Sequence, residues 1–207
     1  MIFDPCKRSL MSFIAALLLL TGCKSASPPM HPENICKVFR QYPQWYWAAQ
    51  KSRRQWGIPI SIQMAIVYQE SHFVSQAEPI RRKLFGVIPW LRPTTASGYA
   101  QALQGTWRRY LKAVGEISGG RSEFSDAVDF IGWYVHLIHQ QLGISLYNVP
   151  ALYLAYHEGV QGYRYHYYVH KKWLLQVANA VGYRAKRYHL QLAECEKTLP
   201  QKPWWRF

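Results

Sequence analysis

Acidic residues are scarce in this chain of 207 residues, with 11 Asp and Glu against 25 Lys and Arg. The formal charge of +14 predicts an anionic neighbour, which could be nucleic acid, a lipid surface or an acidic polymer. Charged residues make up only 17% of the chain and hydrophobic residues 49%, which excludes a generally disordered, collagen-like or low-complexity protein. The length leaves no room for two full-sized domains, so we expect one folded domain with at most an extension.

Signals for a bound cofactor are also missing. His166 and His170 stand four residues apart and can share a helix face, but no carboxylate or Cys lies beside them at ligand spacing. The lone Gly119-Gly120 pair is typical of a turn and not of a phosphate-binding loop. The sequence therefore predicts no metal site and no other cofactor.

The N-terminus begins with a short apolar segment. Residues 9–21 are uncharged, rich in Leu and preceded by Lys7 and Arg8. This run is too short to cross a hydrocarbon layer of roughly 30 Å comfortably, but it is typical of a secretory signal. The Leu-Thr-Gly-Cys sequence of residues 20–23 resembles the lipobox of bacterial lipoproteins, which implies removal of residues 1–22 and acylation of Cys23. The alternative is an ordinary export signal with an incidental cysteine.

Export from the cytoplasm limits which anionic partners the protein can meet, and it favours an oxidising compartment. The lipobox resemblance implies a lipid-anchored periplasmic protein, and Lys24 after the cysteine implies the outer membrane. Cell-wall glycan, with its peptide carboxylates, is then favoured over nucleic acid as the anionic partner. In an oxidising periplasm Cys36 and Cys195 can form a disulfide, and two buried free thiols are the alternative.

The remaining chain is expected to be mostly α-helical. Residues 23–34 are rich in Pro and Ser and predict a flexible tether, followed by a single domain over 35–207. Apolar residues recur at helical spacing over 36–56, with Pro43 splitting or kinking the segment and Gly57 ending it. Residues 60–73, after Pro59, are apolar nearly all round and predict a helix inside the core. A long loop is expected over 75–98, and no segment shows strand alternation; further helices are expected over 99–114, 123–142, 148–158 and 167–196.

Glu70 stands at the end of the apolar helix. A carboxyl beside a buried helix loses hydration, which raises its pKa and lets it donate a proton near neutral pH. The alternative is that Glu70 caps its helix or pairs with an arginine.

Three short motifs follow Glu70-Ser71 in the sequence and indicate which family the chain resembles. Glu70-Ser71 is followed by Ala-Ser-Gly-Tyr-Ala-Gln at residues 96–101, by Gly105-Thr106, and by Ala-Tyr-His-Glu-Gly at residues 155–159. In this order they resemble the catalytic domain of soluble-type lytic transglycosylases, glycoside hydrolase family 23. The resemblance covers about residues 55–165 and implies a lysozyme-like (SLT) helical domain with a substrate cleft.

Carried over by position, the resemblance implies one catalytic residue, Glu70, acting as acid and base. Tyr156 would hydrogen-bond near Glu70 and orient it. The chain departs from the family's Ala-Tyr-Asn-Ala-Gly at His157 and Glu158, and from its Leu-Met at residues 99 and 100. The expected substrate-binding residues are Ser71, Gln101, Tyr156, His157 and Tyr163. Tyr163 and Tyr165 follow the last motif, and their rings can either stack on sugar rings or pack in the core.

The carboxylate count agrees with this resemblance. Most glycosidases use two carboxylates, for which Asp126, Asp129 and Glu158 are candidates here, the first two being expected at the surface. Lytic transglycosylases need only one, which protonates the glycosidic oxygen and then takes a proton from the sugar's 6-hydroxyl. The resemblance thus implies cleavage of the β-1,4 bond between N-acetylmuramic acid and N-acetylglucosamine in peptidoglycan, giving 1,6-anhydro products without a cofactor.

A different class of function stays open. The changes at residues 157 and 158, with a long basic insertion before Gln101, are also compatible with a catalytically degenerate lipoprotein that binds wall glycan or scaffolds an envelope complex. A nucleic-acid binder is disfavoured by the export signal.

Overall fold

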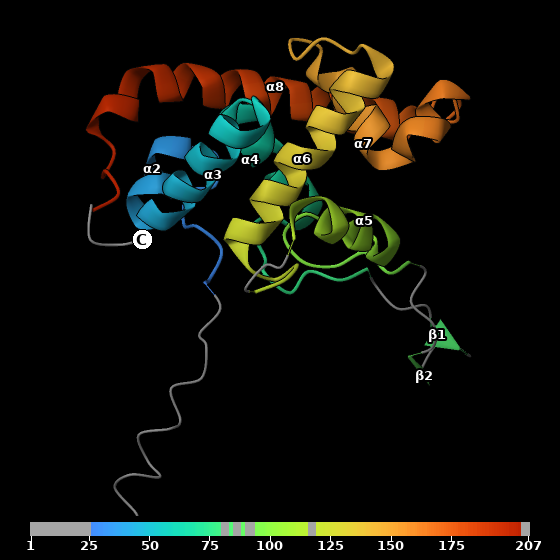
Figure 1. The fold of residues 1–207 in the computed structure, drawn as a ribbon, viewed down its shortest axis with the longest axis horizontal. Coiled ribbons are helices and arrows are strands. Elements are labelled where there is room, and N and C mark those ends of the chain that lie inside the picture. Colours follow the sequence, from blue (N-terminus) through green and yellow to red (C-terminus); the bar gives the residue numbers. More distant parts are fainter. Residues whose placement is uncertain (1–25, 80–82, 85–87, 90–93, 116–118, 204–207) are drawn as a thin grey trace, which may run out of the picture.

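The computed structural model describes residues 26–79, 83–84, 88–89, 94–115 and 119–203. These residues form a mostly helical domain (Figure 1), as expected. The expected signal sequence and Cys23 lie outside them. In the described part of the chain no helix is long and apolar enough to cross a membrane. The elements are α2 (Ile35–Gln41), α3 (Pro43–Trp56), α4 (Ile60–Ser71), β1 (Lys83–Leu84), β2 (Ile88–Pro89), α5 (Gln104–Val114), α6 (Phe124–Leu142), α7 (Val149–Arg164), α8 (Lys172–Cys195) and a 3-10 turn at Glu196–Thr198.

The first helices begin and end where the sequence predicts. Pro43 occupies the first turn of α3, where its missing N–H costs no hydrogen bond, so α2 and α3 are separate helices. Gly57 ends α3 in the left-handed conformation, with φ 73°. Pro59 precedes α4. These breaks bring α4 into the middle of the domain.

Helix α4 forms the centre of the core. Its residues from Ile60 to Val67 are all buried, and the helix packs against α3, α6 and α8. The prediction of a helix inside the core is confirmed. A neighbouring aromatic cluster is built around Trp45, whose ring stacks on Phe124 at 4.1 Å and meets Tyr99 edge-on at 5.8 Å. This packing holds α3, α6 and the 98–101 turn together.

The two ends of the domain are joined covalently. A disulfide links Cys36 in α2 to Cys195 at the end of α8, across a sequence separation of 159 residues. Of the two alternatives that the sequence left open, the structure contains the disulfide. It holds α8, which runs along one side of the molecule in Figure 1, against the N-terminal helices.

The expected tether is part of the folded domain from residue 26 onward. Glu33 accepts hydrogen bonds from Arg184 at 2.7 Å to each oxygen, and it also pairs with Arg187. Tyr188 donates to the carbonyl of Pro32. Pro32 and Glu33 therefore lie against α8, while Ser27 and Met30 are hydrogen-bonded to Tyr42 and Gln41 at the end of α2, so this segment is not a free linker.

Four other features differ from expectation, of which the first is α8, which begins at Lys172 and not at residue 167. Strands β1 and β2 pair antiparallel within the expected loop, and at two residues each they are too short to show an alternating pattern. Helix α5 begins at Gln104 and not at residue 99, because Ser97 bridges to Ala102. Helix α7 runs past residue 158 to Arg164, with a break at Gly159, where φ is 76°.

Candidate functional site

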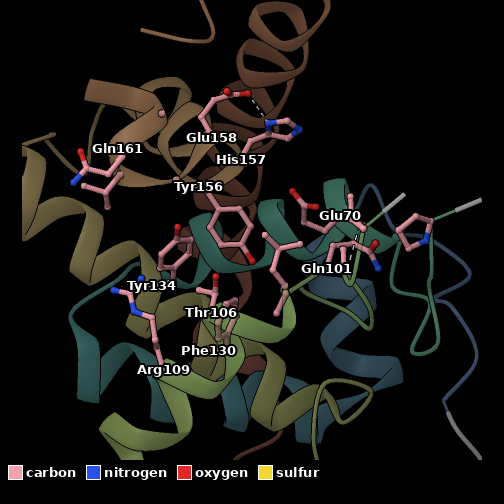
Figure 2. A pocket seen from close by; sticks show the side chains of 18 of the residues that line it. Glu70, Gln101, Thr106, Arg109, Phe130, Tyr134, Tyr156, His157, Glu158 and Gln161 are labelled. Atoms are coloured by element: carbon pink, nitrogen blue, oxygen red, sulfur yellow. Dashed lines mark hydrogen bonds and ion pairs between the residues drawn. The ribbon is translucent and has the colours of Figure 1, made fainter. Parts of the chain in front are cut away.

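A cavity of about 730 Å³ opens between α4, α5, α6 and α7 (Figure 2). It is lined by Glu70, by the 101–103 turn, by one face of α5 and by residues 156–162 around the break in α7. Of the residues that the sequence assigned to substrate binding, Gln101, Tyr156 and His157 line this cavity together with Glu70. Residues from Glu70 to His157, up to 87 positions apart in the chain, thus meet in one cleft.

Glu70 presents a carboxyl that is largely removed from water. It lies in the last turn of α4, which ends as His72 adopts a left-handed φ of 50°. Its Oε1 is fully buried and, among the described residues, has no hydrogen-bond partner. Burial raises the pKa of Glu70 to about 7, and a contact with the Tyr153 hydroxyl offsets part of this increase. Glu70 can therefore hold a proton near neutral pH.

Two tyrosines of α7 pack beside this carboxyl. Burial, with the nearby charge of Glu70, raises the pKa of Tyr153 and of Tyr156, so both hydroxyls stay protonated. The Tyr156 hydroxyl donates to the carbonyl of Ala100 at 2.8 Å. Tyr156 is expected to hydrogen-bond near Glu70 and to help orient it. Its hydroxyl lies close enough to be affected by the charge of Glu70, but its hydrogen bond anchors the 98–101 turn, and the hydroxyl that contacts the Glu70 carboxyl belongs to Tyr153.

The side chain of Gln101 stabilises the loop that lies beside Glu70 in the cleft. Its side-chain Nε2 donates to the carbonyl of Ala77 at 2.7 Å and to that of Gly98 at 3.0 Å. Gly98 has φ 77°, and a Cβ there would approach the Arg121 carbonyl oxygen to 1.9 Å, so only glycine fits this turn. Gln101 lines the cavity while its amide nitrogen fixes the loop that precedes it.

Glu158 forms a polar cluster at the cleft with His157 and Lys171. The Nζ of Lys171 lies 2.7 and 2.8 Å from the two carboxylate oxygens of Glu158, and the Nδ1 of His157 lies 3.0 Å from one of them. Burial alone would raise the pKa of Glu158, but the hydrogen bonds from Lys171 and His157 lower it. Glu158 is therefore an ionised, paired carboxylate and not a second proton donor.

The other two candidate carboxylates, Asp126 and Asp129, form hydrogen bonds that stabilise the fold. The Oδ2 of Asp126 accepts the backbone N–H groups of Gly119 and Gly120, both at 2.9 Å. Asp129 accepts hydrogen bonds from Trp56 at 3.0 Å and Tyr110 at 2.8 Å. Asp129 is thus tied into the interior and not solvated at the surface, which corrects the expectation for that residue.

Three expected residues lie away from the cleft lining. Ser71 is buried, and its hydroxyl donates back to the carbonyl of Val67 at 3.0 Å, so it satisfies its own helix and does not reach a ligand. The ring of Tyr163 stacks on Tyr168 at 5.0 Å, and neither Tyr163 nor Tyr165 lines the cavity. Tyr165 is 67% exposed. Their position just after the Tyr156 motif does not bring them to Glu70, because α7 breaks at Gly159 in between.

The structure also adds residues that sequence reasoning missed. Tyr153 contacts Glu70, and its spacing of three from Tyr156 on one helix face was the signal that could have identified it. Thr106 and Arg109 line the cavity from α5. Their signal was weaker, since only the fold shows which face of α5 is turned toward the cleft.

The helical fold and its cleft define a lysozyme-like domain with a buried carboxyl as its chemical group. The sequence profile of the transglycosylase SLT domain matches residues 11–195, and the chain belongs to this family. The resemblance found in the motifs is thereby confirmed at the level of the family. A search of curated proteins finds no match. Membership indicates, in general terms, lytic transglycosylase activity on peptidoglycan.

Proposed function

We propose that this protein is a peptidoglycan lytic transglycosylase that cleaves the β-1,4 bond between N-acetylmuramic acid and N-acetylglucosamine and releases 1,6-anhydromuramyl products. The observation that supports this reaction most is the state of the two glutamates at the cavity. Burial raises the pKa of Glu70 to about 7, whereas Glu158 is neutralised by Lys171. Glu158 is the only other carboxylate among the described lining residues. One proton donor without a second free carboxylate fits a transglycosylase better than a two-carboxylate hydrolase.

The reaction uses Glu70 twice. Protonated Glu70 gives its proton to the glycosidic oxygen as the bond from that oxygen to C1 of the muramyl residue breaks. The carboxylate then takes the proton of the 6-hydroxyl of the same sugar while that oxygen bonds to C1. The ring closes, Glu70 regains its proton, and no water is consumed.

The surroundings of Glu70 suit both steps. The buried Oε1 disfavours the anion, so the carboxyl readily returns to its neutral form after each cycle. Contact with Tyr153 stabilises the carboxylate that exists between the steps. Gln101 and His157, which line the same cavity, are proposed to position the glycan.

The proposed location is the periplasmic face of the outer membrane. The supporting features are the signal-like residues 1–22, the lipobox-like sequence ending at Cys23, and Lys24. The disulfide between Cys36 and Cys195 suits an oxidising compartment. Acyl chains on Cys23 would hold the enzyme beside its substrate.

The test is product analysis. Full-length protein purified in detergent is incubated with isolated sacculi, and the soluble products are identified by mass spectrometry. We expect anhydromuropeptides from the wild type and none above background from Glu70→Gln. Products with ordinary reducing ends would show a hydrolase. Equal binding of sacculi by both forms with no turnover would support the alternative of a degenerate, glycan-binding scaffold.

A further inference from the structure

The cavity extends well beyond Glu70. In Figure 2, Arg109 and Gln161 lie on the opposite side of Tyr134 and Tyr156 from Glu70. Arg109 comes from α5 and Gln161 from α7. We call this part of the cavity, formed by Arg109 and Gln161 together with Gln141 of α6, the distal end of the cleft.

The distal end carries an unneutralised positive charge. In the described part of the chain, Arg109 makes no ion pair or side-chain hydrogen bond that would use its guanidinium. Its charge acts on the hydroxyl of Tyr134, where it offsets part of the pKa increase that burial causes. A second cation is near, because Arg164 donates to the carbonyl of Gln141 at 3.0 Å.

In the described part of the chain, no carboxylate on the elements around Arg109 is paired with it: of the two acidic residues of α6, Asp126 accepts from Gly119 and Gly120, and Asp129 accepts from Trp56 and Tyr110. Helix α5 contains no Asp or Glu, residues 130–157 contain none, and after Glu158 the next acidic residue is Glu194. Glu158 itself is occupied by Lys171. A polar cavity end with a free guanidinium attracts an anion, and the planar fork of arginine matches a carboxylate with two parallel hydrogen bonds.

We propose that the distal end of the cleft is a carboxylate subsite, in which Arg109 binds a carboxylate of the peptidoglycan strand while Glu70 acts on the glycosidic bond. This inference rests on the proposed function. Two sources supply the same chemistry: the carboxylates of the stem peptide, or the lactyl carboxylate that is free once the peptide has been removed. Arg109 is a substrate-binding residue in this account, and it is not placed at the reacting atoms.

The experiment compares kcat/KM for three substrates prepared from one batch of glycan strands. The first carries intact stem peptides, the second carries stem peptides whose carboxyl groups have been converted to methylamides, and the third has been stripped of peptides by an amidase. The wild-type full-length protein is compared with Arg109→Gln. The matched control is Arg108→Gln, which removes the same charge from the neighbouring position; both arginines are exposed, but only Arg109 lines the cavity.

We expect Arg109→Gln to lower kcat/KM for a carboxylate-bearing substrate about tenfold more than for the methylamide substrate. A selective loss on intact strands identifies the stem peptide as the source, and a selective loss on stripped strands identifies the lactyl group. Arg108→Gln should change kcat/KM by the same factor for all three substrates. Equal losses on all three substrates in Arg109→Gln would overturn the carboxylate subsite while leaving the proposed reaction intact. A wild type that releases no anhydro products from any substrate would instead refute the proposed function.

Discussion

Two glutamates line the same cleft and have opposite electrostatic states. Glu70, at the end of α4, has a buried oxygen without a partner among the described residues, and its pKa is raised to about 7. The side chain of Glu158, beside the break in α7, is only 6% exposed, yet its pKa is lowered. Burial acts on both carboxyls in the same direction.

The difference between them is the cation. Lys171 reaches both oxygens of Glu158, whereas the contact of Glu70 is a neutral tyrosine hydroxyl. A charged partner outweighs the desolvation of a carboxylate, and a neutral hydroxyl offsets only part of it. Burial in a cleft therefore does not by itself keep a carboxyl protonated: of these two glutamates, only the one without a cationic partner has a raised pKa.

Exchanging each glutamate for glutamine should separate the two roles most strongly. Glu70→Gln removes the proposed proton donor and should lower kcat/KM on sacculi by about 1,000-fold. Glu158→Gln removes a charge that Lys171 already neutralises and should cost less than about tenfold, or roughly 1.4 kcal/mol. Release of anhydromuropeptides measures both. Similar losses in the two variants would mean that the reaction depends on two carboxylates.

Removing Lys171 should leave Glu158, like Glu70, as a buried carboxyl without a cationic partner. Lys171→Met leaves the Glu158 carboxylate without its lysine and with His157 as its remaining partner among the described residues, and should lower the free energy of unfolding by about 2–4 kcal/mol at pH 7. Urea denaturation followed by circular dichroism measures the loss. The double variant Lys171→Met with Glu158→Gln should recover most of it, since no charge is then left unpaired. A double variant no more stable than Lys171→Met would contradict this explanation.

The raised pKa of Glu70 also predicts how stability depends on pH. Its pKa rises from an ordinary 4.5 to about 7 on folding, so as the pH climbs through this window the unfolded chain loses the proton first. The folded wild type is therefore destabilised between about pH 5 and pH 7, whereas Glu70→Gln is not. The free energy of unfolding of Glu70→Gln, relative to that of the wild type, should therefore be about 1–3 kcal/mol larger at pH 8 than at pH 5. Urea denaturation at both pH values measures this difference. A constant difference across this range would argue against a raised pKa.

The smallest expected effect is on the neutral partner of Glu70. Tyr153→Phe removes a hydroxyl that favours the carboxylate, so the pKa of Glu70 should rise further. The alkaline limb of the profile of kcat/KM against pH should move upward by about half a pH unit. Tyr183→Phe, at an exposed position on α8, is the matched control and should not move it. A downward shift in Tyr153→Phe would show that the hydroxyl favours the protonated form.

Much of the fold could be predicted because its signals are local. Pro43 and Gly57 set helix ends through their own backbone restrictions, and the apolar surface all round α4 required a buried helix. The position of Glu70 followed from that helix alone. The family motifs then identified Gln101, Tyr156 and His157, which the structure places at one cavity.

What the sequence did not show depends on contacts between distant segments. Glu33 is bound by side chains of α8 about 150 residues later, so a Pro-rich segment that resembles a tether is packed against the domain. Glu158 is neutralised by a lysine 13 residues away, across a helix break that no pattern predicted. Ser71, next to Glu70 in the chain, points into its own helix because neighbours on a helix face different directions. Whether a side chain enters the cleft was therefore decided by helix rotation and tertiary pairing.

The most direct test of the account is the titration of the Glu70 carboxyl itself. Glutamate labelled with carbon-13 at Cδ gives one NMR signal for each side chain, and the signal missing from Glu70→Gln identifies Glu70 in the wild type. We expect a titration midpoint near pH 7. A midpoint near the ordinary 4.5 would contradict it, because Glu70 would then carry no proton to give at neutral pH.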